Sequence, residues 1–393
     1  MTKPDAPLEV EIKLAWPPEK REISADKLFR LVSELEIVKV FCGEPETKQL
    51  VSRYFDTPAL DLFNGKTALR IRDVGARHIQ TVKSAASGQS FARREWESEL
   101  AENTLDLSLV GDGSLSAWLA DLQENAGLAE VFETRITRTQ WLLSVDETVL
   151  ELALDKGSVV SAGREEPISE IEVEVKRGSL RIAIAVALAL THQLGLVHEN
   201  RSKAERGYAL AGTPLPPQIL DFDEAGREND HADQPAAGAV PTAEKLTASI
   251  ARCLPTLRYL TPLTLAEFRP EAGASLSKAL NDISALLSGV DFSVDPSNLV
   301  REIAWLMSVM DQREGSEKSA LADAAADPLG DASGDGVGRV DWSTQLESAI
   351  SSPRYLMMIL ALELLVVRLT DDPYSTVPTE IVQFLPATSQ TIG

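Results

Sequence analysis

The sequence predicts an α+β chain in which a strand-rich first half is followed by an all-α second half. Three observations support this prediction. Residues 1–212 contain short segments in which charged and aliphatic residues alternate, which is the period of a β-strand. Residues 213–241 are rich in proline, glycine and acids and lack periodicity, as a linker does. From Thr242 onward the pattern turns helical, with several segments in which apolar residues recur at helical spacing.

The first half is expected to hold eight strands with helices between them. The strands are predicted at Leu8–Trp16, Leu50–Asp56, Ala68–Asp73, Ile79–Ser84, Phe91–Leu100, Phe132–Val145, Val149–Val160 and Ser169–Lys176. A helix is predicted over Ser24–Leu35, which opens with a serine cap and has apolar residues at helical spacing. Another is predicted over Leu180–Leu194, which is rich in alanine and leucine and ends at Gly195, a usual stop signal.

The second half is expected to be a helical bundle. Its helices are predicted at Ala243–Leu254, Ser275–Leu287, Leu299–Gln312, Asp341–Ile350 and Pro353–Leu369. The segment Asp327–Gly338 is predicted to be a loop. The chain after Asp371 contains several prolines and is expected to be irregular.

Composition narrows the class of protein. The net charge of −22 argues against a general nucleic-acid binder, which would show a basic patch. Cys42 and Cys253 lie far apart and form neither a disulfide framework nor a metal knuckle. The charged N-terminus is unlike a secretory signal, and the apolar runs are too short to cross a bilayer. We therefore expect a cytoplasmic protein without a membrane or nucleic-acid partner.

The first predicted strand places three charged residues on one face. In Glu9-Val-Glu-Ile-Lys13 the charges alternate with aliphatic residues, so Glu9, Glu11 and Lys13 share one side of the strand. Two carboxylates and an ammonium group held this close can cradle a divalent cation beside a phosphate. The alternative is the ordinary half-solvated face of a strand.

Other predicted strands are two-faced in the same way. In each of four predicted strands the charged residues share one face. These groups are Arg70 with Arg72; Arg93 with Glu95 and Glu97; Glu151 with Asp155; and Glu170 with Glu172, Glu174 and Lys176. An antiparallel sheet with its charged face in water explains any one of these strands. A closed sheet with inward charges explains the sorting of arginine and glutamate by strand. Since buried charges need partners or an ionic ligand, this arrangement predicts a wet, ligand-binding channel.

Taken together, these motifs resemble the CYTH family, the triphosphate tunnel metalloenzymes. The opening Glu-x-Glu-x-Lys is followed in family order by Tyr54–Pro58, Leu69–Arg72, Thr81–Lys83, Arg93–Glu97, Ala153–Asp155, Glu170–Glu174 and Ser202–Tyr208. The resemblance covers nearly all of residues 1–212. It implies an eight-stranded antiparallel β tunnel, flanked by helices, that binds a triphosphate along its axis.

The resemblance also implies roles for individual residues. The metal ligands for Mg²⁺ or Mn²⁺ would be Glu9, Glu11, Glu170 and Glu172. The phosphate-binding residues would be Lys13, Arg70, Arg72, Lys83, Arg138 and Lys203. Glu11, Lys13 and Glu172 would act in catalysis. Further candidates are Arg93, Glu95, Glu97, Asp155, Glu174, Arg206 and Arg135; because Arg135 and Arg138 cannot both point inward from one regular strand, we favour Arg138.

The function implied by the resemblance is hydrolysis of inorganic tripolyphosphate to pyrophosphate and phosphate. Adenylyl cyclase or thiamine-triphosphatase activity on the same fold is an alternative, and so is a non-catalytic scaffold for polyphosphate or nucleotides. The position of the second half suggests a CHAD-like domain. It is acidic, and residues 242–393 contain no histidine, so we expect a degenerate module that covers a tunnel mouth or forms a homodimer.

Overall fold

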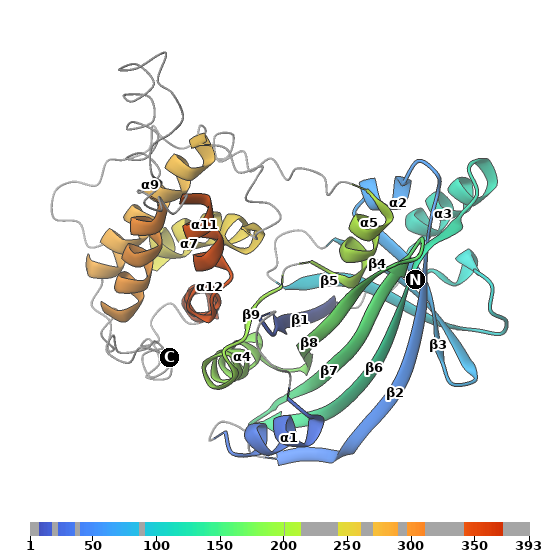
Figure 1. The fold of residues 1–393 in the computed structure, drawn as a ribbon, viewed down its shortest axis with the longest axis horizontal. Coiled ribbons are helices and arrows are strands. Elements are labelled where there is room, and N and C mark those ends of the chain that lie inside the picture. Colours follow the sequence, from blue (N-terminus) through green and yellow to red (C-terminus); the bar gives the residue numbers. More distant parts are fainter. Residues whose placement is uncertain are drawn as a thin grey trace, which may run out of the picture. The chain divides into compact units, whose positions relative to one another are not determined.

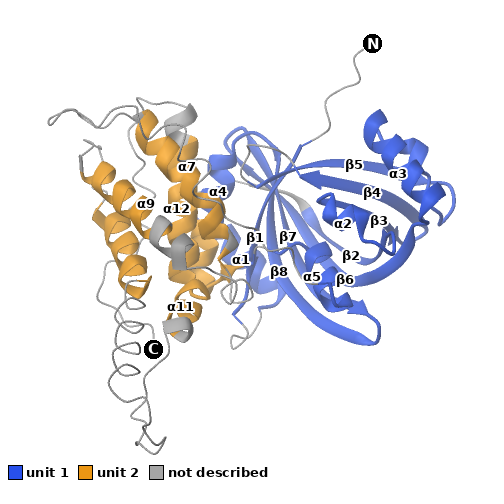
Figure 2. Cartoon of the chain, turned by 90° about the horizontal axis from the view of Figure 1, so that it is seen from above, with its two compact units in different colours: residues 1–187, 199–216 blue, residues 188–198, 217–393 orange. Residues whose placement is uncertain are grey.

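The computed structural model describes residues 8–17, 23–35, 40–85, 91–199, 201–213, 243–260, 270–289, 297–310 and 342–371. The chain divides into two compact units (Figure 2). The first comprises Met1–Ala187 and Glu199–Pro216, and the second comprises Leu188–His198 and Pro217–Gly393. Residues 214–242, which include most of the predicted linker, lie outside the described residues. The predicted domain boundaries at 212 and 242 stay a prediction.

The first unit is built on eight antiparallel strands that close on themselves (Figure 1). They are β1 (Leu8–Ala15), β2 (Val40–Asp56), β3 (Thr67–Val74), β4 (Arg77–Ala85), β5 (Ala92–Leu100), β6 (Ala129–Val145), β7 (Thr148–Ser161) and β8 (Arg164–Arg177). Their order is β5-β4-β3-β2-β6-β7-β8-β1, and β1 also pairs with β5, with Glu9 opposite Arg93. The predicted eight-stranded antiparallel tunnel is thus confirmed.

The largest error in the predicted strands is the start of β2. The strand begins at Val40 rather than at Leu50 and pairs with β6 along its length. Gly43, Glu44 and Pro45 are uncommon in strands, so the sequence pattern did not predict the first part of β2. The ladder tolerates them because its register shifts between Cys42 and Glu46, as it does at a β-bulge.

Helices alternate with the strands along this part of the chain. They are α1 (Ala25–Ser33), α2 (Asp61–Asn64), α3 (Gly113–Asn125), α4 (Leu180–Leu194) and α5 (Lys203–Ala211), with a 3-10 turn at Leu107–Leu109. Ser24 caps α1 as predicted, and its hydroxyl accepts a hydrogen bond from the backbone N–H of Lys27 at 3.2 Å. The predicted helix over Leu180–Leu194 is α4.

Along β1 and β8, charged side chains point into the closed sheet and aliphatic ones point outward. Ile12, Leu14, Ile171 and Val173 are fully buried on the outer side of β1 and β8. A second outer cluster joins β3 and β4 to α2 and α3; it includes Leu62, Leu69, Val82, Val110 and Leu119. An inner apolar cluster carries Tyr208 of α5; its other members are Leu50, Tyr54, Phe132, Ile136, Val159 and Ile168.

The second unit is helical in its described parts, apart from the short strand β9 (Val197–His198). Its helices are α7 (Ala243–Tyr259), α9 (Pro270–Gly289), residues 297–310, α11 (Trp342–Ile350) and α12 (Pro353–Asp371). The buried Glu363 forms an ion pair with Arg258 at 2.6 Å, and the Tyr355 hydroxyl donates to the Leu257 carbonyl at 2.5 Å. The predicted loop Asp327–Gly338 and the chain after Asp371 lie outside the described residues.

In the described part of the chain, no helix combines enough residues with enough apolar character to span a membrane.

Candidate active site

A cavity of about 340 Å³ lies inside the closed sheet. All eight strands and the start of α5 contribute to its wall. Ten lysine and arginine residues and seven glutamates line it, an excess of three positive charges in a chain whose net charge is −22. A cavity with this charge balance is suited to an anionic ligand.

Most predicted site residues meet in this cavity. The lining includes Glu9, Glu11, Lys13, Arg70, Arg72, Lys83, Arg93, Glu95, Glu97, Arg138, Glu172, Glu174 and Lys203. Three candidates stand in the wall rather than on the lumen: Asp155, Glu170 and Arg206 are buried and bind other charged residues. Arg135 is 63% exposed and pairs with Glu133, so of the two arginines on β6 it is Arg138 that enters the cavity.

The acids and bases of β1 are already paired. Lys83 Nζ donates to Glu9 Oε1 at 2.6 Å, and Lys13 Nζ lies 2.9 Å from Glu11 Oε1. Burial would raise the pKa of Glu11, and the nearby Glu172 adds to this effect. Lys13 and Lys83 outweigh both and lower the pKa of Glu11 to about 2. Glu11 is therefore a carboxylate at neutral pH.

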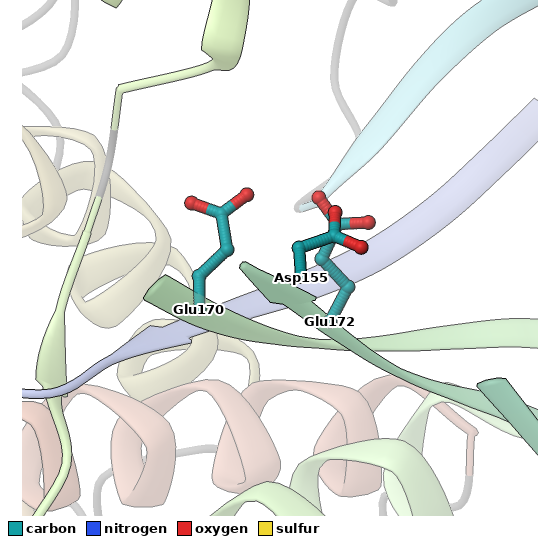
Figure 3. Close-up of side chains that lie close together, drawn as sticks. All are labelled: Asp155, Glu170 and Glu172. Atoms are coloured by element: carbon teal, nitrogen blue, oxygen red, sulfur yellow. The ribbon is translucent and has the colours of Figure 1, made fainter. Parts of the chain in front are cut away.

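Lys203 lies at the centre of three buried acids. Its ammonium group is 2.7 Å from Asp155 Oδ2 and 2.7 Å from Glu172 Oε1, and it also binds Glu170. The three carboxyl groups project from the same side of β7 and β8 (Figure 3). Since burial alone would lower the pKa of Lys203, its raised pKa reflects these carboxylates.

Arg138 supports the same cluster from β6. Its guanidinium binds Asp155 with two hydrogen bonds, from Nε to Oδ1 at 2.7 Å and from an Nη to Oδ2 at 2.6 Å. It also binds Glu172. The planar fork of arginine suits this two-point contact and holds both acids in place.

The opposite wall carries arginines with few acidic partners. Arg70 donates to the Tyr54 hydroxyl at 3.3 Å and lies 3.8 Å from Glu95 and 4.0 Å from Glu97. Its buried Nε has no hydrogen-bond partner among the described residues. Arg72 donates to Ser52 Oγ at 3.1 Å and forms no ion pair with any described carboxylate. Burial, followed by the charges of Arg70 and Arg138, lowers the pKa of Arg72 to about 10. Positive charge without a protein counter-charge favours a bound anion.

Several lining residues are absent from the predicted set. They are Lys48, Tyr54, Arg77, Gln140, Glu151, Lys176 and Ser202. The alternation had already placed Glu151 and Lys176 on the charged faces of β7 and β8, but the resemblance assigned neither of them a role. Lys48 was missed because the start of β2 was placed ten residues too late.

Oxygen donors for a divalent cation are present in two places. Ligand atoms of Asp155, Glu170 and Glu172 lie within 4.8 Å of one another, yet the Lys203 ammonium already contacts all three. Glu9, Glu11 and Glu172 instead face the cavity, and carboxylates are the donors that Mg²⁺ and Mn²⁺ prefer. The donor set therefore fits a hard divalent cation, which would replace an ammonium group as partner of these acids.

The CYTH domain family matches residues 8–208. The inorganic triphosphatase of Haemophilus influenzae is 28% identical over 231 residues, which are 57% of this chain and 62% of that protein. The chain therefore spans less than two thirds of this relative's length.

Two solved structures are similar in part. An adenylate cyclase candidate from Bacillus halodurans is 23% identical, with a TM-score of 0.34 over 50% of this chain and 96% of its own. HpAC1 from Hippeastrum, an adenylyl cyclase candidate with a dominant triphosphatase activity, is 20% identical, with a TM-score of 0.34 over 53% and 98%. The family match alone covers just over half of the 393 residues, and the chain therefore belongs to the CYTH domain family.

Proposed function

We propose that this chain is a divalent-metal-dependent inorganic triphosphatase that hydrolyses tripolyphosphate to pyrophosphate and phosphate inside the tunnel. The observation that carries the proposal is the excess of positive charge on the cavity wall. Arg72 contributes to this excess because it forms no ion pair with a described carboxylate. A ligand made only of phosphate groups would use this wall along its whole length. The curated relative named inorganic triphosphatase supports the same activity.

Binding would proceed by exchange of ionic partners. Lys13 and Lys83 are held by Glu11 and Glu9 in the free protein. Lysine is a flexible point charge, so both ammonium groups can turn from these acids to phosphate oxygens. Glu9 and Glu11 would then be available to hold the divalent cation.

Arginine and lysine residues would hold the phosphate chain in line for attack. Arg70 and Arg72 on β3 can each contact two oxygens, and together they neutralise charge that develops on the bridging oxygen. Glu9, Glu11 and Glu172 would hold Mg²⁺ or Mn²⁺, which as a Lewis acid neutralises phosphate oxygens and lowers the pKa of a bound water. Lys203 and Arg138 keep Glu172 ionised and oriented.

A substrate panel tests this proposal against its alternatives. Phosphate release by the full chain is measured with tripolyphosphate, ATP and thiamine triphosphate, each with Mg²⁺, Mn²⁺ or a chelator. We expect metal-dependent release from tripolyphosphate, abolished in Glu11→Gln and Lys13→Ala and retained in Arg135→Gln. Preference for thiamine triphosphate, or formation of cyclic AMP from ATP, would support the alternative enzymes. Tight binding of tripolyphosphate without turnover would support a scaffold and contradict the proposal.

The remaining expectations belong to the same proposal. A cytoplasmic location, assembly as a homodimer and a degenerate CHAD-like role for the second unit all rest on the sequence alone. Cell fractionation tests the location, and the mass of the full chain in solution tests the dimer. Phosphate release from the same substrates, measured after removal of residues 242–393, would show whether the second unit affects turnover.

A further inference from the structure

Lys203 reaches the acid cluster of Asp155, Glu170 and Glu172 from a helix. Lys13 and Lys83, which pair with other acids of the cavity, lie on strands. Lys203 is the first residue of α5, and its ammonium lies 2.7 Å from both Asp155 and Glu172. The ladder hydrogen bonds that fix a strand residue do not fix a helix on a sheet. The position of Lys203 therefore depends on what attaches α5 to the strands.

One attachment is a direct approach of the helix backbone to an aromatic ring. A Cβ atom added to Gly207 would lie 2.1 Å from the ring of Phe132, closer than any real contact. Phe132 cannot easily move away, since it stacks on Tyr54 with ring centroids 4.6 Å apart. Glycine at this position lets α5 lie directly against the aromatic side chain of β6.

The second attachment is a buried hydrogen bond one residue further along. Tyr208 is 2% exposed, and its hydroxyl donates to Asp56 Oδ2 at 2.7 Å. The Tyr208 ring packs against Phe63 and Phe132, with centroids 4.5 and 5.1 Å away. Ring packing allows small sliding movements, whereas the hydrogen bond fixes the helix at one position.

Asp56 is held in place independently of Tyr208. Its carboxylate accepts hydrogen bonds from the backbone N–H groups of Thr57 at 2.7 Å, Leu62 at 2.9 Å and Phe63 at 3.0 Å. Asp56 is therefore a rigid acceptor at the junction of β2 and α2. A variant that loses only the Tyr208 hydroxyl leaves this acceptor with three partners, so the fold should survive.

We propose that Tyr208 and Asp56 are positioning residues for the triphosphatase site. Their hydrogen bond fixes α5 so that the Lys203 ammonium stays among Asp155, Glu170 and Glu172, which keeps Glu172 oriented toward the cavity. The effect on turnover rests on the proposed function. The effect on the position of Lys203 does not.

The test is Tyr208→Phe in the full chain, with two readouts. The first is the rate at which an amine-reactive anhydride modifies Lys203, measured by mass spectrometry relative to Lys13. Lys13 is also poorly exposed but lies on a strand, so global unfolding would expose both lysines and only release of α5 would expose Lys203 alone. The second is kcat/KM for tripolyphosphate.

Loss of a hydrogen bond of about 1 kcal/mol corresponds to about a fivefold change in an equilibrium. We therefore expect Lys203 modification to rise about fivefold relative to Lys13 and kcat/KM to fall by a similar factor. Tyr355→Phe is the matched control, since it removes another buried tyrosine hydroxyl that bonds a carbonyl in the second unit. It should change neither readout.

Results other than the expected ones separate the positioning of Lys203 from the proposed activity. Unchanged modification of Lys203 in Tyr208→Phe overturns it. Faster modification with unchanged kcat/KM in an active enzyme also overturns the role in turnover. Faster modification in a protein whose wild-type form releases no phosphate would leave the positioning of Lys203 supported and the proposed function refuted.

Discussion

Replacing Arg72 by methionine should stabilise the ligand-free protein while removing its activity. Arg72 is a guanidinium that forms no ion pair with a described acid, and its own hydrogen bond goes to Ser52. Burial and the charges of Arg70 and Arg138 lower its pKa from the ordinary arginine value to about 10. Methionine keeps most of the apolar stem and removes the charge.

The magnitude follows from that pKa. Each pKa unit corresponds to about 1.4 kcal/mol, so the lowering of the Arg72 pKa to about 10 means that the charge costs the folded protein at most about 3.5 kcal/mol. Solvent screening reduces this cost, and loss of the hydrogen bond to Ser52 offsets about 1 kcal/mol of the gain. The net expectation is an increase of about 1–2 kcal/mol in the free energy of unfolding.

The sign of the pH dependence is also fixed. The folded-state pKa of Arg72 lies below its unfolded-state value, so the cost of the charge is present at every pH below about 10. It declines as the pH rises above that value. The increase in the free energy of unfolding caused by Arg72→Met should therefore be constant between pH 6 and pH 9, because this range lies below the pKa of about 10.

Urea unfolding without phosphate or metal measures the stability, and phosphate release from tripolyphosphate measures the activity. We expect kcat/KM to fall by about 100-fold or more, the range for loss of one charge-stabilising donor. Arg135→Met is the control, since Arg135 is largely exposed and pairs with Glu133; both quantities should stay near wild type. A destabilised Arg72→Met protein, or one with full activity, would refute the reasoning.

Three further changes have defined outcomes. Glu172→Gln should lower phosphate release by about 100-fold, whereas Glu99→Gln, at an exposed acid outside the cavity, should match wild type in the same assay. Gly207→Ala should lower the free energy of unfolding by about 1–3 kcal/mol in urea, because its Cβ would overlap the ring of Phe132; an unchanged midpoint would show that α5 can move. Burial raises the pKa of the Cys253 thiol from 9 to about 11, so stability held by the neutral thiol is lost as the pH rises from 9 to 11. Iodoacetamide should then modify Cys253 far more slowly in the native chain than in urea at pH 8, and equal rates by mass spectrometry would contradict the burial.

Alternation along the strands, with the sorting of arginine and glutamate by strand, favoured a closed sheet and identified much of its lining, and the family resemblance implied the eight-stranded tunnel. On β8, Glu172 and Glu174 face inward while Ile171 and Val173 face outward, and the period-2 pattern shows this directly. The same pattern cannot tell how far an inward side chain stands from the lumen. Glu170 follows the alternation yet lies in the wall, because Lys203 covers it.

The contacts of α5 could not be predicted from the sequence. Lys203 and Glu172 are 31 positions apart, and their contact depends on how a helix packs across β6, β7 and β8. Neither residue pattern nor spacing encodes the approach of Gly207 to Phe132. Helix α3 was missed for a different reason. Its N-terminal Asp112 cap is a clear signal, but Gly113 and the weak apolar periodicity that follows it obscure the helix.

The most direct test of this account is a crystal structure of the inactive Glu11→Gln variant grown with tripolyphosphate and Mn²⁺. We expect the phosphate chain inside the closed sheet, with oxygens bound by Arg70 and Arg72 and an anomalous manganese signal beside Glu9 and Glu172. Phosphate bound on the outer surface, or a lumen that stays free of phosphate at saturating concentration, would contradict the assignment of this cavity as the active site.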